Sequence, residues 1–95
     1  MKIEQENNSR GGYFIAVENE VEIGRMTYLW AGLKIIIDHT EVEPKFSGRG
    51  IGKLLVLDAV RYAREKKIKI LPLCPFAKSV FNKNSDLADT LFFNH

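Results

Sequence analysis

The sequence has little cysteine, little net charge and no long apolar run, and each of these absences removes a class of protein. Its single cysteine, Cys74, excludes an internal disulfide framework and any zinc site built from several thiolates. A formal charge of +2 at pH 7 is too small to indicate a nucleic-acid-binding protein, and no metal site is expected. No stretch approaches the roughly 20 apolar residues of a membrane span, and none begins the chain as a secretory signal. We therefore expect a soluble, unprocessed protein of the reducing cytoplasm, without a membrane or nucleic-acid partner.

The composition that is present is typical of a globular domain. Of the 95 residues, 45% are hydrophobic and 27% are charged, which is close to the average for folded proteins. This length suits one domain with a modest core, and the chain contains neither an internal repeat nor a linker. A single domain over residues 1–95 is therefore expected.

The first half of the chain predicts four antiparallel strands. Segments rich in aromatic and β-branched residues alternate with turn formers, and the expected strands span residues 2–5, 13–17, 21–30 and 33–42. Turn formers at residues 6–12 predict a hairpin between the first two strands. The run of Ile35, Ile36 and Ile37 is apolar on both faces, which is typical of a central strand.

The second half predicts one long helix followed by a fifth strand. Residues 50–66 carry apolar side chains at helical spacing, and the face expected to pack on the sheet consists of Ile51, Leu55, Val56, Ala59, Val60, Tyr62 and Ala63. Leu54 and Leu57 fall outside this face, and they are expected either to be partly exposed or to contact a partner. A strand at residues 68–73 would complete a right-handed β-α-β crossover and lie parallel to the strand at residues 33–42.

The chain is expected to end in two short helices. Pro75 suits the first position of one helix, and Ser85 suits the N-cap of the other. The apolar residues expected to pack this last helix are Leu87, Leu91, Phe92 and Phe93. Asn94 and His95 would form a frayed tail. The expected fold class is α/β (α+β), with a mixed sheet of about five strands, antiparallel in its first four strands and parallel between the fourth and fifth.

Three glycines at every second position join the most apolar strand to the long helix. Gly48, Gly50 and Gly52 have no Cβ, so the backbone can take left-handed turns and approach a ligand closely. The following helix offers amides without an intrahelical partner and the positive end of its dipole, which together favour an anion such as a pyrophosphate. The alternative is a turn that only connects strand to helix, because a lone Gly-x-Gly motif is weakly specific.

Three separated motifs resemble those of a known enzyme family. They are Asp38-His39-Thr40, Gly48-Arg49-Gly50-Ile51-Gly52 and Leu71-Pro72-x-Cys74-Pro75-Phe76. The three motifs occur in the same order and on the same elements as in the Gcn5-related N-acetyltransferases. The chain resembles this family, especially a short single-domain branch of it, over about residues 33–84. Two positions depart from the pattern: Ser47 stands where larger enzymes have Arg or Gln, and Asn84-Ser85-Asp86 stands where the short branch has His-Pro-Glu.

The resemblance implies a truncated acetyltransferase (GNAT-like) fold that binds acetyl-CoA as co-substrate. The pyrophosphate would rest on the amides of the glycine turn, and the pantetheine arm would extend the edge of the strand near Val42. Arg49 and Lys53 would add positive charge, and the alternative for both is a solvated cation near a helix start. The implied cofactor-binding residues are Val42, Ser47, Gly48, Arg49, Gly50, Ile51, Gly52 and Lys53.

Two residues are candidates for the chemistry. A helix start at Pro75 would lower the pKa of the Cys74 thiol and make it a nucleophile, whereas the alternative is a small, buried hydrophobic residue. His39 would act as a base for the amine or for Cys74, and its alternative is a structural histidine. The crossover brings the carboxyl ends of the adjacent parallel strands, and hence His39 and Cys74, to the same side of the sheet, so the thioester is expected between them. Glu41 shares the face of His39 and ranks below these two candidates.

The resemblance therefore implies a small acetyl-CoA-dependent N-acetyltransferase, and we expect a monomer or a weak homodimer. The turn at residues 6–12 replaces the helices that build the acceptor pocket in full-sized relatives, so the acceptor amine stays unidentified. The alternative function is non-catalytic binding or sensing of acyl-CoA. A nucleic-acid module is a weaker third interpretation, because the aromatic residues are interleaved with acidic ones.

Overall fold

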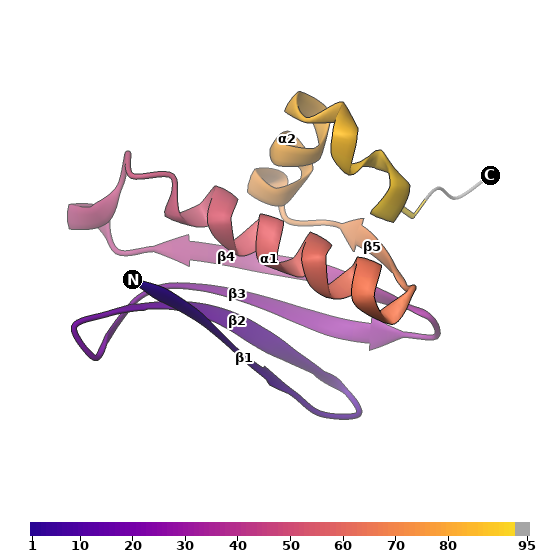
Figure 1. Cartoon of the computed structure of the whole chain (residues 1–95), viewed down its shortest axis with the longest axis horizontal. Helices are drawn as coiled ribbons and strands as arrows, with labels where there is room; N and C mark the ends of the chain where they lie inside the picture. Colours follow the sequence, from indigo (N-terminus) through magenta and orange to yellow (C-terminus); the bar gives the residue numbers. More distant parts are fainter. Residues whose placement is uncertain (93–95) are drawn as a thin grey trace.

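Five strands form a mixed sheet in the order in which they occur in the chain (Figure 1). The computed structural model describes residues 1–92, so Phe93 and the tail expected at Asn94 and His95 lie outside the described residues. The strands are β1 (Lys2–Asn7), β2 (Gly11–Glu18), β3 (Val21–Ala31), β4 (Lys34–Val42) and β5 (Lys69–Pro72). Strands β1 to β4 are antiparallel and β5 is parallel to β4, which confirms the predicted fold class.

Tight turns join the antiparallel strands. Between β1 and β2, the side chain of Asn8 accepts hydrogen bonds from two backbone amides, the nearer being that of Arg10 at 2.8 Å. Between β2 and β3, Asn19 and Glu20 have positive φ angles of 51° and 66°, the shape that a two-residue hairpin turn requires. This second turn directly follows Glu18, which contacts the glycine turn.

The helix α1 (Ile51–Lys66) packs across one face of the sheet (Figure 1). Its buried side chains are those that helical spacing predicts: Ile51, Leu55, Val56, Ala59, Val60 and Ala63, with Tyr62 partly buried. The sheet contributes Phe14, Met26, Tyr28, Ile35 and Ile37 to the same core. Fully burying one of the larger side chains of this set contributes about 1.5–3 kcal/mol, so the contact between α1 and the sheet is a large source of stability. Leu54 is 40% exposed and Leu57 is partly buried. Neither α1 nor any other helix within residues 1–92 is long and apolar enough to cross a membrane.

After β5 the chain forms α2 (Pro75–Lys83) and a short 3-10 helix, η2 (Ser85–Thr90). The proline at the first position of α2 confirms where this helix was predicted to begin. The prediction that Ser85 caps the last helix is wrong. The amide of Leu87 donates to the carbonyl of Asn84 at 3.0 Å, so Asn84 is the residue that flanks η2.

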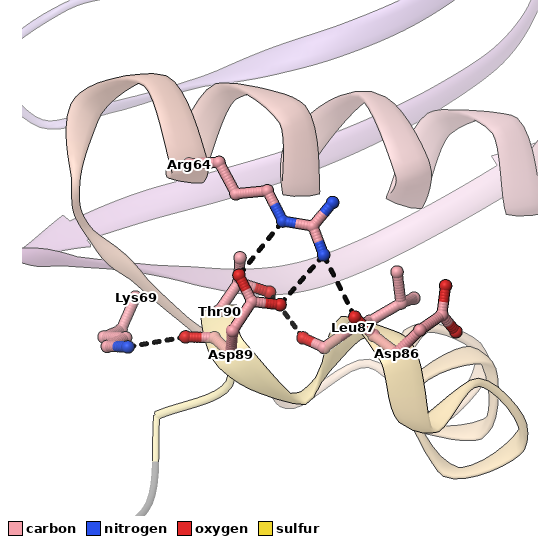
Figure 2. Close-up of polar contacts among 6 residues, drawn as sticks. All are labelled: Arg64, Lys69, Asp86, Leu87, Asp89 and Thr90. Carbon is pink, nitrogen blue, oxygen red and sulfur yellow. Dashed lines mark hydrogen bonds and ion pairs between the residues drawn. The ribbon is translucent and has the colours of Figure 1, made fainter.

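An arginine of α1 ties η2 to the rest of the protein (Figure 2). The guanidinium of Arg64 donates two hydrogen bonds to the carboxylate of Asp89, at 2.8 and 3.0 Å, and a third to the carbonyl of Asp86 at 3.0 Å. Lys69 of β5 donates to the backbone carbonyl of Asp89. The last described segment therefore contacts both α1 and β5, which makes it part of the domain.

Candidate functional site

The strands β4 and β5 separate part-way along their length. Strand β5 pairs with β4 only over residues 34–37. The amides of Leu73 and Cys74 then both donate to the carbonyl of Ile37, each at 3.0 Å, and the chain turns into α2. Strand β4 continues to Val42, so its last residues present an edge that β5 does not cover.

A cleft of about 750 Å³ lies between this end of β4, the glycine turn with the start of α1, and one face of α2. Seven of the predicted cofactor-binding residues line it: Val42, Ser47, Gly48, Gly50, Ile51, Gly52 and Lys53. The lining residues that were not predicted are Thr40, Phe46, Phe76, Ser79, Val80, Lys83 and Asn84. Four of these residues, Phe76, Ser79, Val80 and Lys83, lie on α2 at spacings of three and four residues, so they share one face of the helix. This helical spacing is the sequence signal that would have identified them.

The glycine turn takes a shape that depends on its glycines. Gly48 and Gly50 have φ angles of +82° and +75°, in the left-handed region that other residues avoid. Gly52 is needed for another reason, because a Cβ there would lie 2.7 Å from ring atoms of Phe76. The amide of Leu54 donates to the carbonyl of Gly50 at 3.1 Å, so the amides before it in the first turn of α1 have no intrahelical acceptor.

The charges around the cleft suit an anion. Its charged lining residues are Lys53 and Lys83, and among the described residues no carboxylate lines it. The N-terminus of α1 adds the partial positive charge of the helix dipole at the glycine turn. Within residues 1–92, no group of three or more His, Cys, Asp or Glu side chains is arranged to hold a metal ion. A phosphorylated ligand therefore fits this cleft better than a cationic one.

Arg49, the remaining predicted cofactor-binding residue, contacts a carboxylate instead of lining the cleft. Its Nη1 and Nη2 atoms donate to the two carboxylate oxygens of Glu18, at 3.0 and 2.9 Å. This hydrogen-bonded pairing lowers the pKa of Glu18 and raises the pKa of Arg49. The Arg49 guanidinium carbon also lies 5.3 Å from the ring centroid of Phe46. Arg49 therefore links the glycine turn to the end of β2.

Cys74 directly precedes α2 and is almost buried beside the cleft. The residue is 6% exposed, and its thiol donates a hydrogen bond to Oγ1 of Thr40 at 3.4 Å. Burial alone would raise the pKa of the thiol. Hydrogen bonds from the Thr40 hydroxyl and from the backbone amides of Ala77 and Phe76 outweigh burial, so the pKa lies below its usual value. The position and the pKa of the thiol suit a nucleophile, whereas its small exposure restricts access.

His39 lies on the other face of β4. Its Nε2 atom is 2.9 Å from Oε1 of Glu41, and both side chains are mostly exposed. Side chains alternate along a strand, so Thr40 between them points to the opposite face, where it contacts Cys74. The structure therefore does not bring His39 and Cys74 together. This finding corrects the expectation that a thioester would lie between these two side chains.

Comparisons with known proteins match nearly the whole chain. A sequence profile described as GCN5-related N-acetyl-transferase matches residues 12–90. Among solved structures, a GCN5-like protein from Staphylococcus aureus is 31% identical in sequence with a TM-score of 0.76, and the match covers 99% of this chain and 90% of that one. No curated protein sequence matches this chain significantly.

Larger acetyltransferases share the fold at lower identity. The ribosomal-protein-S18-alanine N-acetyltransferase of Escherichia coli has a TM-score of 0.69 at 11% identity, and Tetrahymena GCN5 has a TM-score of 0.67 at 14% identity. These matches cover 81% and 93% of this chain but only 53% and 64% of those proteins. The chain therefore spans about half to two thirds of their length, and the likeness to them concerns the fold alone.

Proposed function

This chain belongs to the family of GCN5-related N-acetyltransferases, and from that premise we propose that it binds acetyl-CoA in the cleft and transfers the acetyl group to an amine. The observation that carries the proposal is the composition of the cleft, which combines the N-terminus of α1 with Lys53 and Lys83. No carboxylate of residues 1–92 lines it. Such a site favours a ligand with several phosphates.

The parts of the cleft fit the parts of acetyl-CoA. The first-turn amides of α1 would hold the pyrophosphate, and Lys53 and Lys83 would add charge. The backbone of β4 near Val42 has no β5 partner, so its polar groups would pair with the amides of the pantetheine arm. Ser47 offers a hydroxyl where larger relatives offer Arg or Gln, which leaves backbone amides as the main phosphate donors.

For the transfer step, we propose a route through Cys74. Its thiolate would attack the thioester carbonyl carbon, forming a new carbon–sulfur bond while the bond to the CoA sulfur breaks, and CoA would leave as a thiolate that takes up a proton. The amine nitrogen would then attack the acetyl-cysteine, lose a proton and release the Cys74 thiolate. The lowered pKa of Cys74 and its position at the start of α2 support this route.

His39 is the candidate base for the amine if the acetyl group is transferred directly. It faces away from Cys74 together with Glu41, so it would not reach an amine that attacks acetyl-Cys74 on the other face of β4. The connection between β1 and β2 is a short turn at residues 8–10, so no helix is inserted there to cover the acceptor side. An open acceptor side suits an amine on a large molecule as well as a small one.

Calorimetry and intact-protein mass spectrometry test the proposal. Wild type is expected to bind CoA, and mixing it with acetyl-CoA alone should add one acetyl group at residue 74. Cys74→Ser should lack this adduct, and His39→Ala should keep it, because His39 lies on the opposite face of β4. Amine transfer that is retained in Cys74→Ser and lost in His39→Ala would indicate direct transfer with His39 as the base. A folded wild-type protein that binds no CoA would refute the proposed site. Transfer to amines that survives in Cys74→Ser would refute the covalent route and leave direct transfer.

Acyl-CoA binding or sensing without turnover is a second candidate function, and one observation favours it. Cys74 is 6% exposed and His39 lies on the other face of β4, so the two titratable groups do not meet at the cleft. This function predicts that CoA binds in calorimetry while no amine or peptide of a broad panel is acetylated. In either case we propose a monomer or weak homodimer in the cytoplasm, where the single cysteine stays reduced.

A further inference from the structure

Thr40 lies between the buried thiol of Cys74 and the cleft. Thr40 lines the cleft, whereas Cys74 is not among the lining residues and is only 6% exposed. The thiol donates to Oγ1 of Thr40 at 3.4 Å, although the two residues are 34 positions apart in the sequence. The contact joins β4 to the start of α2, so the tertiary fold creates it at the point where β4 and β5 separate.

We propose that Thr40 is a positioning residue for Cys74, because its hydroxyl links the buried sulfur to the cleft and stabilises the thiolate there. In the thiol form, sulfur donates to Oγ1. When the thiol loses its proton to water, the hydroxyl rotates and donates to the sulfur anion. That Cys74 attacks a thioester rests on the proposed function. The hydrogen bond between Thr40 and Cys74 does not, because it is present in the protein without a ligand.

The hydroxyl of Thr40 acts without help from a charged neighbour. The favourable contributions to the Cys74 thiolate are hydrogen bonds, from this hydroxyl and from backbone amides, and burial opposes them. No charged group is among the causes that shift the pKa of Cys74. Lys53 of α1 and Lys83 of α2 line the cleft, and His39 and Glu41 of β4 face away from Cys74. Among the described residues, the Thr40 hydroxyl is therefore the one side-chain group that stabilises the Cys74 thiolate. Replacing Thr40 removes this hydrogen bond without changing any charge.

A set of threonine variants isolates the hydroxyl. Thr40→Val keeps the β-branched shape that suits a strand and removes the hydroxyl, whereas Thr40→Ser keeps the hydroxyl and removes the methyl group. Thr40→Ala also removes the hydroxyl and serves if valine disturbs the fold. Thr27→Val is the matched control, because the Thr27 hydroxyl donates to Oδ1 of Asp38 at 2.6 Å and has no contact with Cys74.

The thiolate can be followed directly, because the sequence contains one cysteine. Its ultraviolet absorbance is recorded against pH without acetyl-CoA, as the difference from Cys74→Ser. In Thr40→Val and Thr40→Ala, we expect the midpoint to rise by about one pH unit, which is about tenfold less thiolate at neutral pH. Thr40→Ser and Thr27→Val should keep the wild-type midpoint. A wild-type midpoint in folded Thr40→Val and Thr40→Ala would overturn the proposal.

A second measurement connects this link to the reaction. The rate at which acetyl-CoA acetylates residue 74 should fall about tenfold in Thr40→Val at neutral pH and recover as pH rises, because the remaining thiol then ionises. A rate that falls equally at every pH would contradict a role through the thiolate. If the absorbance midpoint shifts but wild type takes up no acetyl group, the link between Thr40 and Cys74 stands and the covalent proposed function fails.

Discussion

The substitution Gly52→Ala should stabilise the protein only when the aromatic ring of Phe76 has been removed. Gly52 lies in the first turn of α1, and an added Cβ would lie 2.7 Å from two ring atoms of Phe76. Carbon atoms attract one another at about 3.5–4.0 Å, so at this distance the ring must move. The backbone of Gly52 is outside the left-handed region, so alanine can adopt it without strain. The contact with the ring is therefore the only obstacle.

The magnitudes follow from two opposing effects. Alanine is more favourable than glycine in a helix by up to about 1 kcal/mol, which stabilises the variant. Displacing a packed side chain typically costs about 1–3 kcal/mol, and Phe76 is 43% exposed, which favours the lower end. In wild type, Gly52→Ala should therefore leave the free energy of unfolding unchanged or lower it by about 1 kcal/mol. In the Phe76→Ala background it should raise that free energy by up to about 1 kcal/mol.

Urea unfolding of the four proteins of this double-mutant cycle measures the coupling. Gly48→Ala is the control, because its Cβ would have nothing within 4 Å while its φ is +82°. We expect this control to lose about 1 kcal/mol through backbone strain in both backgrounds. If Gly52→Ala has the same effect with and without the Phe76 ring, the ring does not limit this position, and the explanation for the third glycine is refuted.

Three further outcomes are expected. Leu55→Ala should lower the free energy of unfolding by about 2–5 kcal/mol and Leu54→Ala by less than about 1 kcal/mol, measured in urea, because Leu55 is 0% exposed and Leu54 is 40% exposed. Burial raises the pKa of Tyr28, so its contribution to stability is present below about pH 10 and is lost as the pH rises further. Urea unfolding measured across this pH range should therefore show a smaller loss of unfolding free energy at high pH in Tyr28→Phe than in wild type. Gly50→Val places a β-branched residue at a φ of +75° in the turn, and we expect calorimetry to show CoA affinity weakened by more than about tenfold, whereas unchanged affinity in a folded variant would contradict the glycine-turn site.

The fold was predictable because its signals are local. The buried face of α1 follows from helical spacing within 16 residues, and the interior position of β4, between β3 and β5, follows from three adjacent isoleucines. The parallel pairing of β5 follows from the rule that a helix connecting two strands forms a crossover. Ser85 shows the limit of such reasoning. Ser85 is a good capping residue and is the first residue of η2, yet the preceding Asn84 supplies the carbonyl that accepts from the Leu87 amide.

The candidate site was predictable only where one short segment builds it. The glycine turn is such a segment, and its residues apart from Arg49 line the cleft. Arg49 instead pairs with Glu18, 31 residues away, because the hairpin between β2 and β3 brings this carboxylate to the turn. The residues of α2 that line the cleft reach it likewise because β5 separates from β4 after Pro72. These positions depend on tertiary contacts, which the local sequence pattern does not contain.

The orientation of β4 at the cleft also runs against its simplest sequence pattern. Side chains alternate along a strand, and Ile35 and Ile37 are both 0% exposed. Continued alternation would turn His39 toward the helices and Thr40 away from them. The structure has the reverse arrangement, with His39 mostly exposed and Thr40 in contact with the buried thiol.

A bulge in β4 accounts for this reversal. Ile37 and His39 pair with adjacent residues of β3, so Asp38 has no counterpart and acts as one inserted residue. One extra residue exchanges the two faces for everything that follows it, which places Thr40 at the cleft. Nothing in the sequence marks Asp38 as inserted, because it is neither a glycine nor next to a proline. The identity of the side chain that reaches Cys74 is therefore decided by strand pairing and not by the motif that contains it.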